Sequence, residues 1–245
     1  MTQRIALVTG GIGGLGTAIC RALTDAGHRV IATDLPAAPE RVAAFSDATG
    51  GAVRFEPADV SDQAQCADLI ARVQAAEGAI DILVNNAGIT RDATLRKMDL
   101  AQWNAVLQVN LTSAFQLCHH AIDGMIQRGH GRIVNISSVS GQTGNFGQAN
   151  YAAAKAGLHG LTMSLAREVA AKGITVNSVS PGYVRTPMTA AMPAHVLEKT
   201  QAAVPVGRLG EPSDIARAVA FFCEDAAGYI TGANLPVNGG LFMGF

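Results

Sequence analysis

Short continuous apolar runs alternate along the chain with longer stretches that are apolar on one face only. A strand covered on both faces needs no polar alternation, so the short runs predict buried strands. The longer stretches predict helices; within residues 62–76, Leu69, Ile70 and Val73 fall on one helical stripe. The expected strands cover residues 4–9, 29–34, 52–57, 80–85, 132–137, 174–180 and 234–238.

Helices are expected between these strands, over residues 17–26, 39–49, 62–76, 100–128, 150–172 and 212–224. The helix over 100–128 is expected to break before Trp103, and residues 188–200 are expected to form a lid. Strand and helix alternate throughout, which predicts an α/β fold with a mostly parallel sheet and helices on both faces. No linker-like segment divides the chain, so residues 1–245 are predicted to form a single domain.

Composition and charge exclude several classes of partner. The chain has 245 residues and a formal net charge of −1, and no basic block marks a nucleic-acid surface. No apolar run is long enough to span a bilayer, and Met1-Thr-Gln-Arg-Ile lacks the apolar core of a signal peptide, so a cytoplasmic location is expected. The four cysteines lack metal-binding spacing and are expected to be small buried hydrophobes; no metal is expected.

A glycine-rich turn, Thr9-Gly10-Gly11-Ile12-Gly13-Gly14-Leu15-Gly16, lies between the first expected strand and the first expected helix. Glycine lets the backbone approach a pyrophosphate, and the helix N-terminus that follows offers free N–H groups. The turn therefore predicts a dinucleotide site within a Rossmann-like doubly wound sheet. The alternative is a purely structural turn. The expected contacts are Gly10, Ile12, Gly13, Gly14, Leu15 and Gly16.

Asp34 ends the second strand, where a carboxylate can accept hydrogen bonds from the adenosine ribose. A 2′-phosphate would meet that carboxylate at short range, so NAD(H) is expected in preference to NADP(H), which stays possible. If the loop before Arg41 folds back, the positive charge of this residue offsets part of the repulsion between Asp34 and a 2′-phosphate. The alternative for Asp34 is an ordinary residue of a surface turn.

Two further segments are expected to contact the dinucleotide. Asp59 and Val60 follow the third strand, where a carboxylate can meet the adenine amino group; a helix N-cap is the alternative for Asp59. The short polar and small residues Asn86, Ala87 and Gly88 follow the fourth strand and suit a backbone lying against a cofactor.

Tyr151 and Lys155 are four residues apart and so share one face of a helix. A phenol is a poor acid near neutrality, and a neighbouring ammonium is expected to lower its pKa. The hydroxyl of Ser138 can hold a carbonyl oxygen at the same point. The three side chains predict proton delivery to a ketone that receives a hydride from a nicotinamide. An incidental surface pair is the alternative.

Together these motifs resemble the short-chain dehydrogenase/reductase family over nearly the whole chain. The resemblance rests on the glycine turn, Asn85-Asn86-Ala87-Gly88, Asn110, Ser138, Tyr151, Lys155 and Pro181-Gly182. It implies that Asn110 joins the catalytic group by holding a water near Lys155, and that the chain forms a homotetramer. It also implies that the nicotinamide is bordered by Pro181, Gly182, Val184 and Thr186.

Within that family the chain is similar to acetoacetyl-CoA reductases of polyhydroxybutyrate synthesis, for example in Gly88-Ile-Thr-Arg-Asp92 and Gly144-Asn-Phe-Gly-Gln148. This implies reduction of acetoacetyl-CoA to (R)-3-hydroxybutanoyl-CoA. Such enzymes often look built for NADPH, whereas Asp34 favours NADH. The alternatives are a 3-oxoacyl-[acyl-carrier-protein] reductase, a small-alcohol dehydrogenase and a non-catalytic dinucleotide sensor. The expected substrate contacts, besides Ser138 and Tyr151, are Asp92, Asn145, Phe146, Gln148 and Tyr183.

Overall fold

The computed structural model describes residues 3–186, 189 and 194–244 of the chain, and its centre is a seven-stranded parallel sheet in the order β3-β2-β1-β4-β5-β6-β7. The α/β doubly wound fold predicted from the alternation of strands and helices is therefore confirmed. The order changes direction between β1 and β4, which is where ligands bind in open α/β sheets. The strands are β1 Ile5–Thr9, β2 Arg29–Asp34, β3 Val53–Pro57, β4 Ile82–Asn85, β5 Gly131–Ile136, β6 Ile174–Pro181 and β7 Asn234–Val237.

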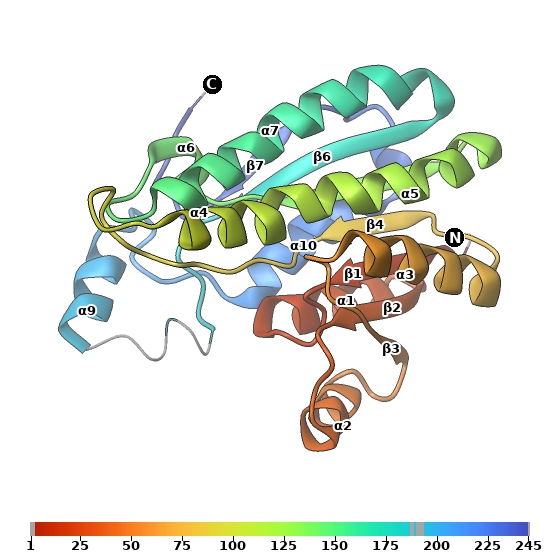
Figure 1. Ribbon diagram of the computed structural model, residues 1–245, viewed down its shortest axis with the longest axis horizontal. Coiled ribbons are helices and arrows are strands. Elements are labelled where there is room, and N and C mark those ends of the chain that lie inside the picture. The colour runs from red at the N-terminus through yellow and green to blue at the C-terminus, as the bar shows by residue number, and fades with distance from the viewer. Residues whose placement is uncertain (1–2, 187–188, 190–193, 245) are drawn as a thin grey trace.

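Helices cover both faces of the sheet (Figure 1). On one face, α1 (Gly14–Asp25) packs along α10 (Pro212–Cys223). On the other face lie α3 (Gln63–Glu77), α5 (Ser113–Arg128) and α7 (Ala149–Val169). The remaining helices are α2 (Pro39–Ala48), which stands beside the β3 edge, α4 (Leu100–Leu107), α6 (Ser140–Thr143) and α9 (Ala194–Ala202).

Each face of the sheet has its own apolar core. Val8 and Val84 face α1 and α10, whereas Leu7 and Leu83, one position earlier on the same strands, face α3 and α5. All four side chains are fully buried. Both faces of the central strands β1 and β4 are thus covered, which is why their sequences are almost continuously apolar. The four cysteines are free and buried, as expected.

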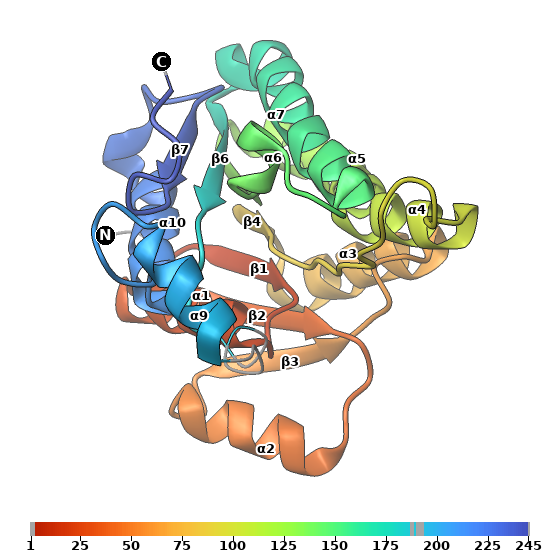
Figure 2. The same ribbon diagram turned by 90° about the vertical axis from the view of Figure 1, so that its left-hand side faces the viewer.

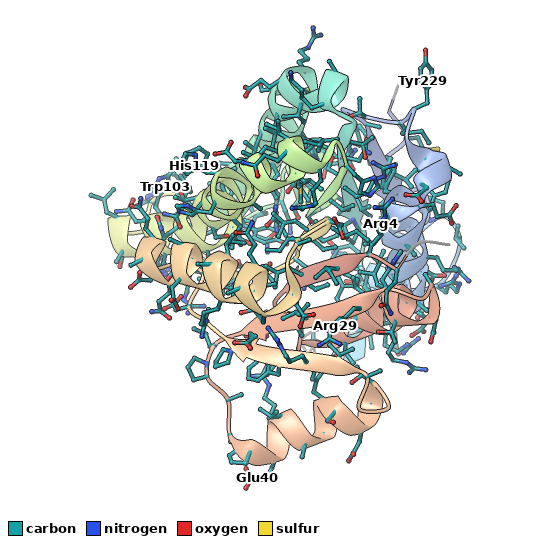
Figure 3. The ribbon with its side chains drawn as sticks, turned by 90° about the vertical axis from the view of Figure 1, so that its right-hand side faces the viewer. Arg4, Arg29, Glu40, Trp103, His119 and Tyr229 are labelled. Carbon is teal, nitrogen blue, oxygen red and sulfur yellow. The ribbon has the colours of Figure 1, made fainter. Side chains whose placement is uncertain are left out.

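The strands begin at one end of the molecule and their carboxyl ends meet at the other. Figure 3 views the amino end, where Arg4 precedes β1 and Arg29 opens β2. Arg29 pairs there with Glu77 at the end of α3. Figure 2 faces the opposite end, toward which the strands run and over which α9 lies. The loops that follow the strands therefore share that end of the sheet.

The break in the expected 100–128 helix was predicted at the wrong place. Trp103 lies inside α4, because Asp99 and Gln102 form a capping box that starts the helix at Leu100. The interruption is instead a π-helical turn at Gln108–Thr112. Within this turn the side chain of Asn110 donates hydrogen bonds to the carbonyl oxygens of Ile89 and Val106 at 2.9 and 2.8 Å.

Other element ends differ from the expectations by a few residues. The first helix begins at Gly14 because the last two glycines of the turn already have helical geometry. The expected helix 150–172 ends at Val169 and is followed by a 3-10 turn. Residue 188 and residues 190–193 of the expected lid lie outside the described residues, and α9 covers the part from Ala194.

No helix in the described ranges is long and apolar enough to cross a membrane. In the same part of the chain, no cluster of three or more histidine, cysteine or acidic side chains is arranged to hold a metal ion.

Candidate active site

A cavity of about 820 Å³ opens at the carboxyl ends of the strands, on the side that Figure 2 faces. Its walls come from the turn between β1 and α1, the ends of β2, β4, β5 and β6, and the first turns of α7. The glycine turn, Asp34, Ser138, Tyr151 and Lys155 all line it. The structure therefore gathers the expected nucleotide contacts and the expected catalytic side chains into one space.

The glycines of the turn are required by close packing. Gly10 has a φ of +61°, and a β-carbon on it would lie 3.0 Å from Cα of Ala87. A β-carbon on Gly16 would lie 2.1 Å from the carbonyl oxygen of Gly10. Gly13 caps α1 without a side-chain hydrogen bond, which leaves the first N–H groups of that helix free for an anion. The turn thus fits a pyrophosphate, as predicted.

Thr9 joins the glycine turn to the loop after β4, a role that the sequence did not reveal. Its Oγ1 accepts hydrogen bonds from the backbone N–H groups of Asn86 and Ala87 at 3.0 and 2.9 Å. In return, Nδ2 of Asn86 donates to the carbonyl oxygens of Thr9 and Gly10 at 2.9 and 3.2 Å. The two loops are fixed to each other across the β1–β4 boundary, where a dinucleotide would cross.

Beside the end of β2, the cavity is lined by the carboxylate of Asp34 and the guanidinium of Arg41. Oδ1 of Asp34 accepts from the N–H of Leu35 at 2.9 Å, and Nη2 of Arg41 lies 3.9 Å from Oδ2 of Asp34. Both side chains line the cavity. The loop before Arg41 has thus folded back, so that a cation stands beside the carboxylate expected to select the ribose.

Asp59 and Val60 also line the cavity. The alternative role of Asp59 as a helix N-cap is wrong, because Asp62 caps α3 by accepting from the N–H groups of Ala64 and Gln65. Oδ1 of Asp59 instead accepts from the N–H and the hydroxyl of Ser61 at 2.8 and 2.7 Å. These bonds hold the loop after β3 at the cavity wall.

Tyr151 and Lys155 lie on the same face of α7, as predicted, with Nζ of Lys155 5.6 Å from the centre of the Tyr151 ring. Nζ donates to the carbonyl oxygen of Ile136 at 2.8 Å, and the hydroxyl of Ser137 donates to the carbonyl oxygen of Lys155 at 2.8 Å. These two bonds tie the helix to the end of β5. The adjoining hydroxyl of Ser138 accepts from the N–H of Ser140 at 3.1 Å and is also hydrogen-bonded to the phenol of Tyr151.

The pKa of Tyr151 moves in the opposite direction from the one expected from its lysine neighbour. Burial raises the pKa of the phenol, and the nearby Asp92 raises it further, whereas the hydrogen bond to Ser138 lowers it in part. Burial also lowers the pKa of Lys155 to about 8. The spacing of the two residues could not reveal this, because the depth of the helix in the fold sets the cost of charging both groups.

Asn110 lies beside this group but does not reach the cavity wall. Its Oδ1 is buried and has no partner among the described residues. Gly88 fills the space between Asn110 and Lys155: a β-carbon there would lie 2.6 Å from Oδ1 of Asn110 and 3.5 Å from Nζ of Lys155. An unpaired buried acceptor close to a buried ammonium is a suitable position for a bridging water.

The expected substrate residues divide into two groups. Asn145, Gln148 and Tyr183 line the cavity, whereas Asp92 and Phe146 do not. Asp92 accepts from Nε2 of Gln148 at 2.9 Å and thus supports a cavity residue. Phe146 is 90% exposed because it stands at the outer side of the loop after α6. The family resemblance indicated a substrate contact at Phe146, but the side chain is not part of the cavity wall.

The four residues expected to border a nicotinamide all line the cavity: Pro181, Gly182, Val184 and Thr186. Gly182 has to be small, because a β-carbon on it would lie 2.8 Å from Cα of Asn238. Asn150, for which no role was expected, is fully buried and donates to the carbonyl oxygen of Arg91 at 3.0 Å. Further lining residues that were not expected are Leu35, Ala58, Ile89, Thr90, Val109, Ile136, Ser137, Val139, Ser140 and Thr189.

A glycine-lined pyrophosphate cradle next to a serine, a tyrosine and a lysine defines a dinucleotide-dependent oxidoreductase. The family model described as enoyl-(acyl carrier protein) reductase matches residues 10–242, and the chain belongs to this short-chain dehydrogenase/reductase family. Members of the family use a nicotinamide dinucleotide, which the cradle fits.

The relatives that match essentially the whole chain include the following three. An acetoacetyl-CoA reductase of Allochromatium vinosum is 54% identical and covers 98% of this chain and 99% of its own. An acetoacetyl-CoA reductase of Cupriavidus necator is 51% identical, with 100% of both chains covered. A 3-oxoacyl-[acyl-carrier-protein] reductase of Escherichia coli is 48% identical, with 98% of each covered.

Proposed function

We propose that the protein reduces acetoacetyl-CoA to (R)-3-hydroxybutanoyl-CoA with NADH as the preferred cofactor. The observation that carries the proposal is the gathering of Ser138, Tyr151 and Lys155 on the wall of the same cavity as the glycine turn. The names of the two relatives that are 54% and 51% identical support the substrate.

The proton and the oxygen of the substrate are handled by side chains of this chain. The hydroxyl of Ser138, whose oxygen accepts from the N–H of Ser140, donates its own proton in a hydrogen bond to the ketone oxygen. Tyr151, protonated because burial raises its pKa, transfers its proton to the same oxygen as negative charge develops there. Lys155 stabilises the phenolate that remains, and Asn110 holds the water that returns a proton. When bound, the reduced nicotinamide supplies the hydride.

The preference for NADH rests on Asp34. Two like charges about 4 Å apart repel by roughly 4 kcal/mol at an effective dielectric of 20, so a 2′-phosphate beside Asp34 costs affinity. Arg41, at 3.9 Å from the carboxylate, offsets part of that repulsion. We therefore expect a preference for NADH that is moderate, with NADPH still accepted.

The second candidate is reduction of a 3-oxoacyl group carried on acyl carrier protein, which the Escherichia coli relative favours by its name. The kcat/KM values for acetoacetyl-CoA and acetoacetyl-[acyl-carrier-protein], measured under the same conditions, separate the two. The proposal predicts a higher value for the CoA thioester, together with an (R) product. A strong preference for the protein-borne substrate would assign the chain to the second candidate.

The proposal also includes a homotetramer, a single domain over residues 1–245 and a cytoplasmic role in polyhydroxybutyrate synthesis. Exposed apolar side chains on two neighbouring helices, Phe115 of α5 and Met163 of α7, support association between copies. Sedimentation equilibrium measures the assembled mass, and four chains are expected.

A further inference from the structure

The helix that carries Tyr151 begins without a conventional side-chain cap. The first N–H groups of a helix have no carbonyl partner within it, and the residue before the helix usually supplies an acceptor. In α7 that residue is Gln148, whose side chain forms no capping bond. Its carbonyl oxygen accepts from the N–H of Ala152 at 2.8 Å, so Tyr151 is the last residue whose N–H precedes the regular helical bonds. Helix ends fray where such groups lack partners, and this end holds the proposed acid.

Asn150 supplies the missing acceptor from within the helix. Its Oδ1 accepts from the N–H of Tyr151 at 2.8 Å. Its Nδ2 donates to the carbonyl oxygens of Arg91 and Gln102 at 3.0 and 3.3 Å. Arg91 lies in the loop between β4 and α4, and Gln102 lies in α4, which packs against α7 (Figure 1). One amide group therefore joins the start of α7 to two other segments.

The partners fix the orientation of this amide. Asn150 is fully buried; its Nδ2 faces two carbonyl oxygens, whereas its Oδ1 faces an N–H. Turning the amide over would set Oδ1 against the two carbonyl oxygens and Nδ2 against the N–H of Tyr151, and all three bonds would be lost. The amide is therefore held in one orientation, and the backbone of Tyr151 is held with it.

The position of this backbone decides where the phenol lies. The side chain of Tyr151 is hydrogen-bonded to Ser138, and both residues line the cavity. Ser138 stands in the loop after β5, whereas the phenol reaches it from α7. A shift of the first turn of α7 therefore moves the acid relative to the serine that binds the same ketone oxygen. A displacement of about 1 Å at a reacting group can cost about 100-fold in rate.

Resting on the proposed function, we propose that Asn150 is the positioning residue of the acid. It ties the first turn of α7 to α4 and to the loop before α4, so that the hydroxyl of Tyr151 meets the ketone oxygen. Asn150 is not part of the cavity wall, so it acts through Tyr151 rather than on the substrate. The glycine turn that fits the dinucleotide lies on other elements, and the effect of Asn150 therefore falls on kcat rather than on cofactor binding.

The first test is Asn150→Ala, alone and combined with Tyr151→Phe. Alone, it should lower kcat for acetoacetyl-CoA reduction about ten- to a hundredfold and leave the Kd of NADH nearly unchanged. In the Tyr151→Phe background it should lower the residual kcat by less than about twofold, because two residues that act through one group are not additive. A general effect on the fold would lower kcat by the same factor in both backgrounds.

The matched control is Asn177→Ala. Asn177 is also buried and lies outside the cavity wall; its Nδ2 donates to the carbonyl oxygen of Ile230 at 2.8 Å, and its Oδ1 accepts from the N–H of Ala233 at 3.1 Å. Both alanine variants should have a lower free energy of unfolding, measured by denaturant titration. Only Asn150→Ala should lose kcat and show faster amide hydrogen exchange at the start of α7.

A second variant, Asn150→Asp, keeps the shape of the side chain and the oxygen that accepts from Tyr151. Its ionised carboxylate repels the two carbonyl oxygens, whereas its protonated form donates to one of them. Burial raises the pKa of a carboxyl, so lowering the pH restores a donor. The kcat of Asn150→Asp relative to the unaltered protein should rise as the pH is lowered, whereas the same ratio for Asn150→Ala should stay constant. This measurement decides the matter if Asn150→Ala does not fold.

Three results would overturn the positioning role: an unchanged kcat in Asn150→Ala, an equal loss of kcat with and without the Tyr151 hydroxyl, or a relative kcat of Asn150→Asp that does not rise at lower pH. Failure of the proposed function gives a different result, namely an unaltered protein that does not reduce acetoacetyl-CoA. Reduction that depends on Tyr151 but is unaffected by Asn150→Ala would refute the positioning role alone.

Discussion

Nζ of Lys155 lies 5.6 Å from the centre of the Tyr151 ring and 2.8 Å from the carbonyl oxygen of Ile136. The ammonium is thus held beside the phenol by the end of β5 and is almost completely buried. Burial lowers the pKa of Lys155 to about 8 and raises that of Tyr151. Of the two groups, the lysine titrates first as the pH rises from neutrality.

The first prediction concerns the pH dependence of reduction. Tyr151 must be protonated to act as the acid, and its raised pKa keeps it so. Lys155 must be charged to stabilise the phenolate, and it loses its proton as the pH rises through about 8. We therefore expect kcat to be highest below that pH and to fall above it with an apparent pKa near 8. A kcat that stays constant up to pH 10 would show that the charge of Lys155 is not needed.

Tyr151→Phe removes the proposed acid and keeps the ring. General acid catalysis contributes about 10²- to 10⁴-fold, so kcat should fall by that factor. The affinity for NADH, followed by fluorescence titration, should change little because the cradle is untouched. Tyr229→Phe is the matched control: Tyr229 is fully exposed and points away from the protein in Figure 3. If the Tyr151→Phe variant had the same kcat as the unaltered protein, Tyr151 would be excluded as the acid.

The choice between NADH and NADPH is predicted to depend on two neighbouring side chains. Asp34→Ala removes the repulsion of a 2′-phosphate and should raise the NADPH/NADH ratio of kcat/KM by about tenfold or more. Arg41→Gln removes the cation 3.9 Å from that carboxylate and should lower the same ratio. Steady-state kinetics with both cofactors measure both changes. If the two variants shift the ratio in the same direction, this assignment of the two residues is wrong.

Gly88 is predicted to be essential to the catalytic group for steric reasons. In Gly88→Ala the new methyl group would lie 2.6 Å from Oδ1 of Asn110, which is held within the π-helical turn. Asn110 and Lys155 must then move, and kcat should fall at least about tenfold. Gly160→Ala is the control, since the same methyl group in α7 meets nothing within 4 Å. It should raise the free energy of unfolding by about 0.5–1 kcal/mol, as denaturant titration would show. Full activity of Gly88→Ala would contradict the packing argument.

The sequence was sufficient for the sheet and for the position of most cavity residues. Buried parallel strands are continuously apolar, and residues at their carboxyl ends must share one edge, so Asp34 and Asn86 could be placed without coordinates. The glycine turn was recognisable because only glycine tolerates the contacts at Gly10 and Gly16.

Features that depend on tertiary contacts could not be found in this way. The π-helical turn contains Asn110, which bonds to the distant Ile89, and no local pattern records that contact. The direction of the Tyr151 pKa depends on burial rather than on the spacing to Lys155. The exposure of Phe146 likewise follows from how the loop after α6 is folded.

The most direct test of the account is the initial rate of reduced-nicotinamide oxidation with acetoacetyl-CoA, measured with NADH and with NADPH. We predict turnover with both cofactors, a higher kcat/KM with NADH, and loss of both rates in Tyr151→Phe. An unaltered protein that binds NADH but does not oxidise it in the presence of acetoacetyl-CoA would contradict the proposed reaction.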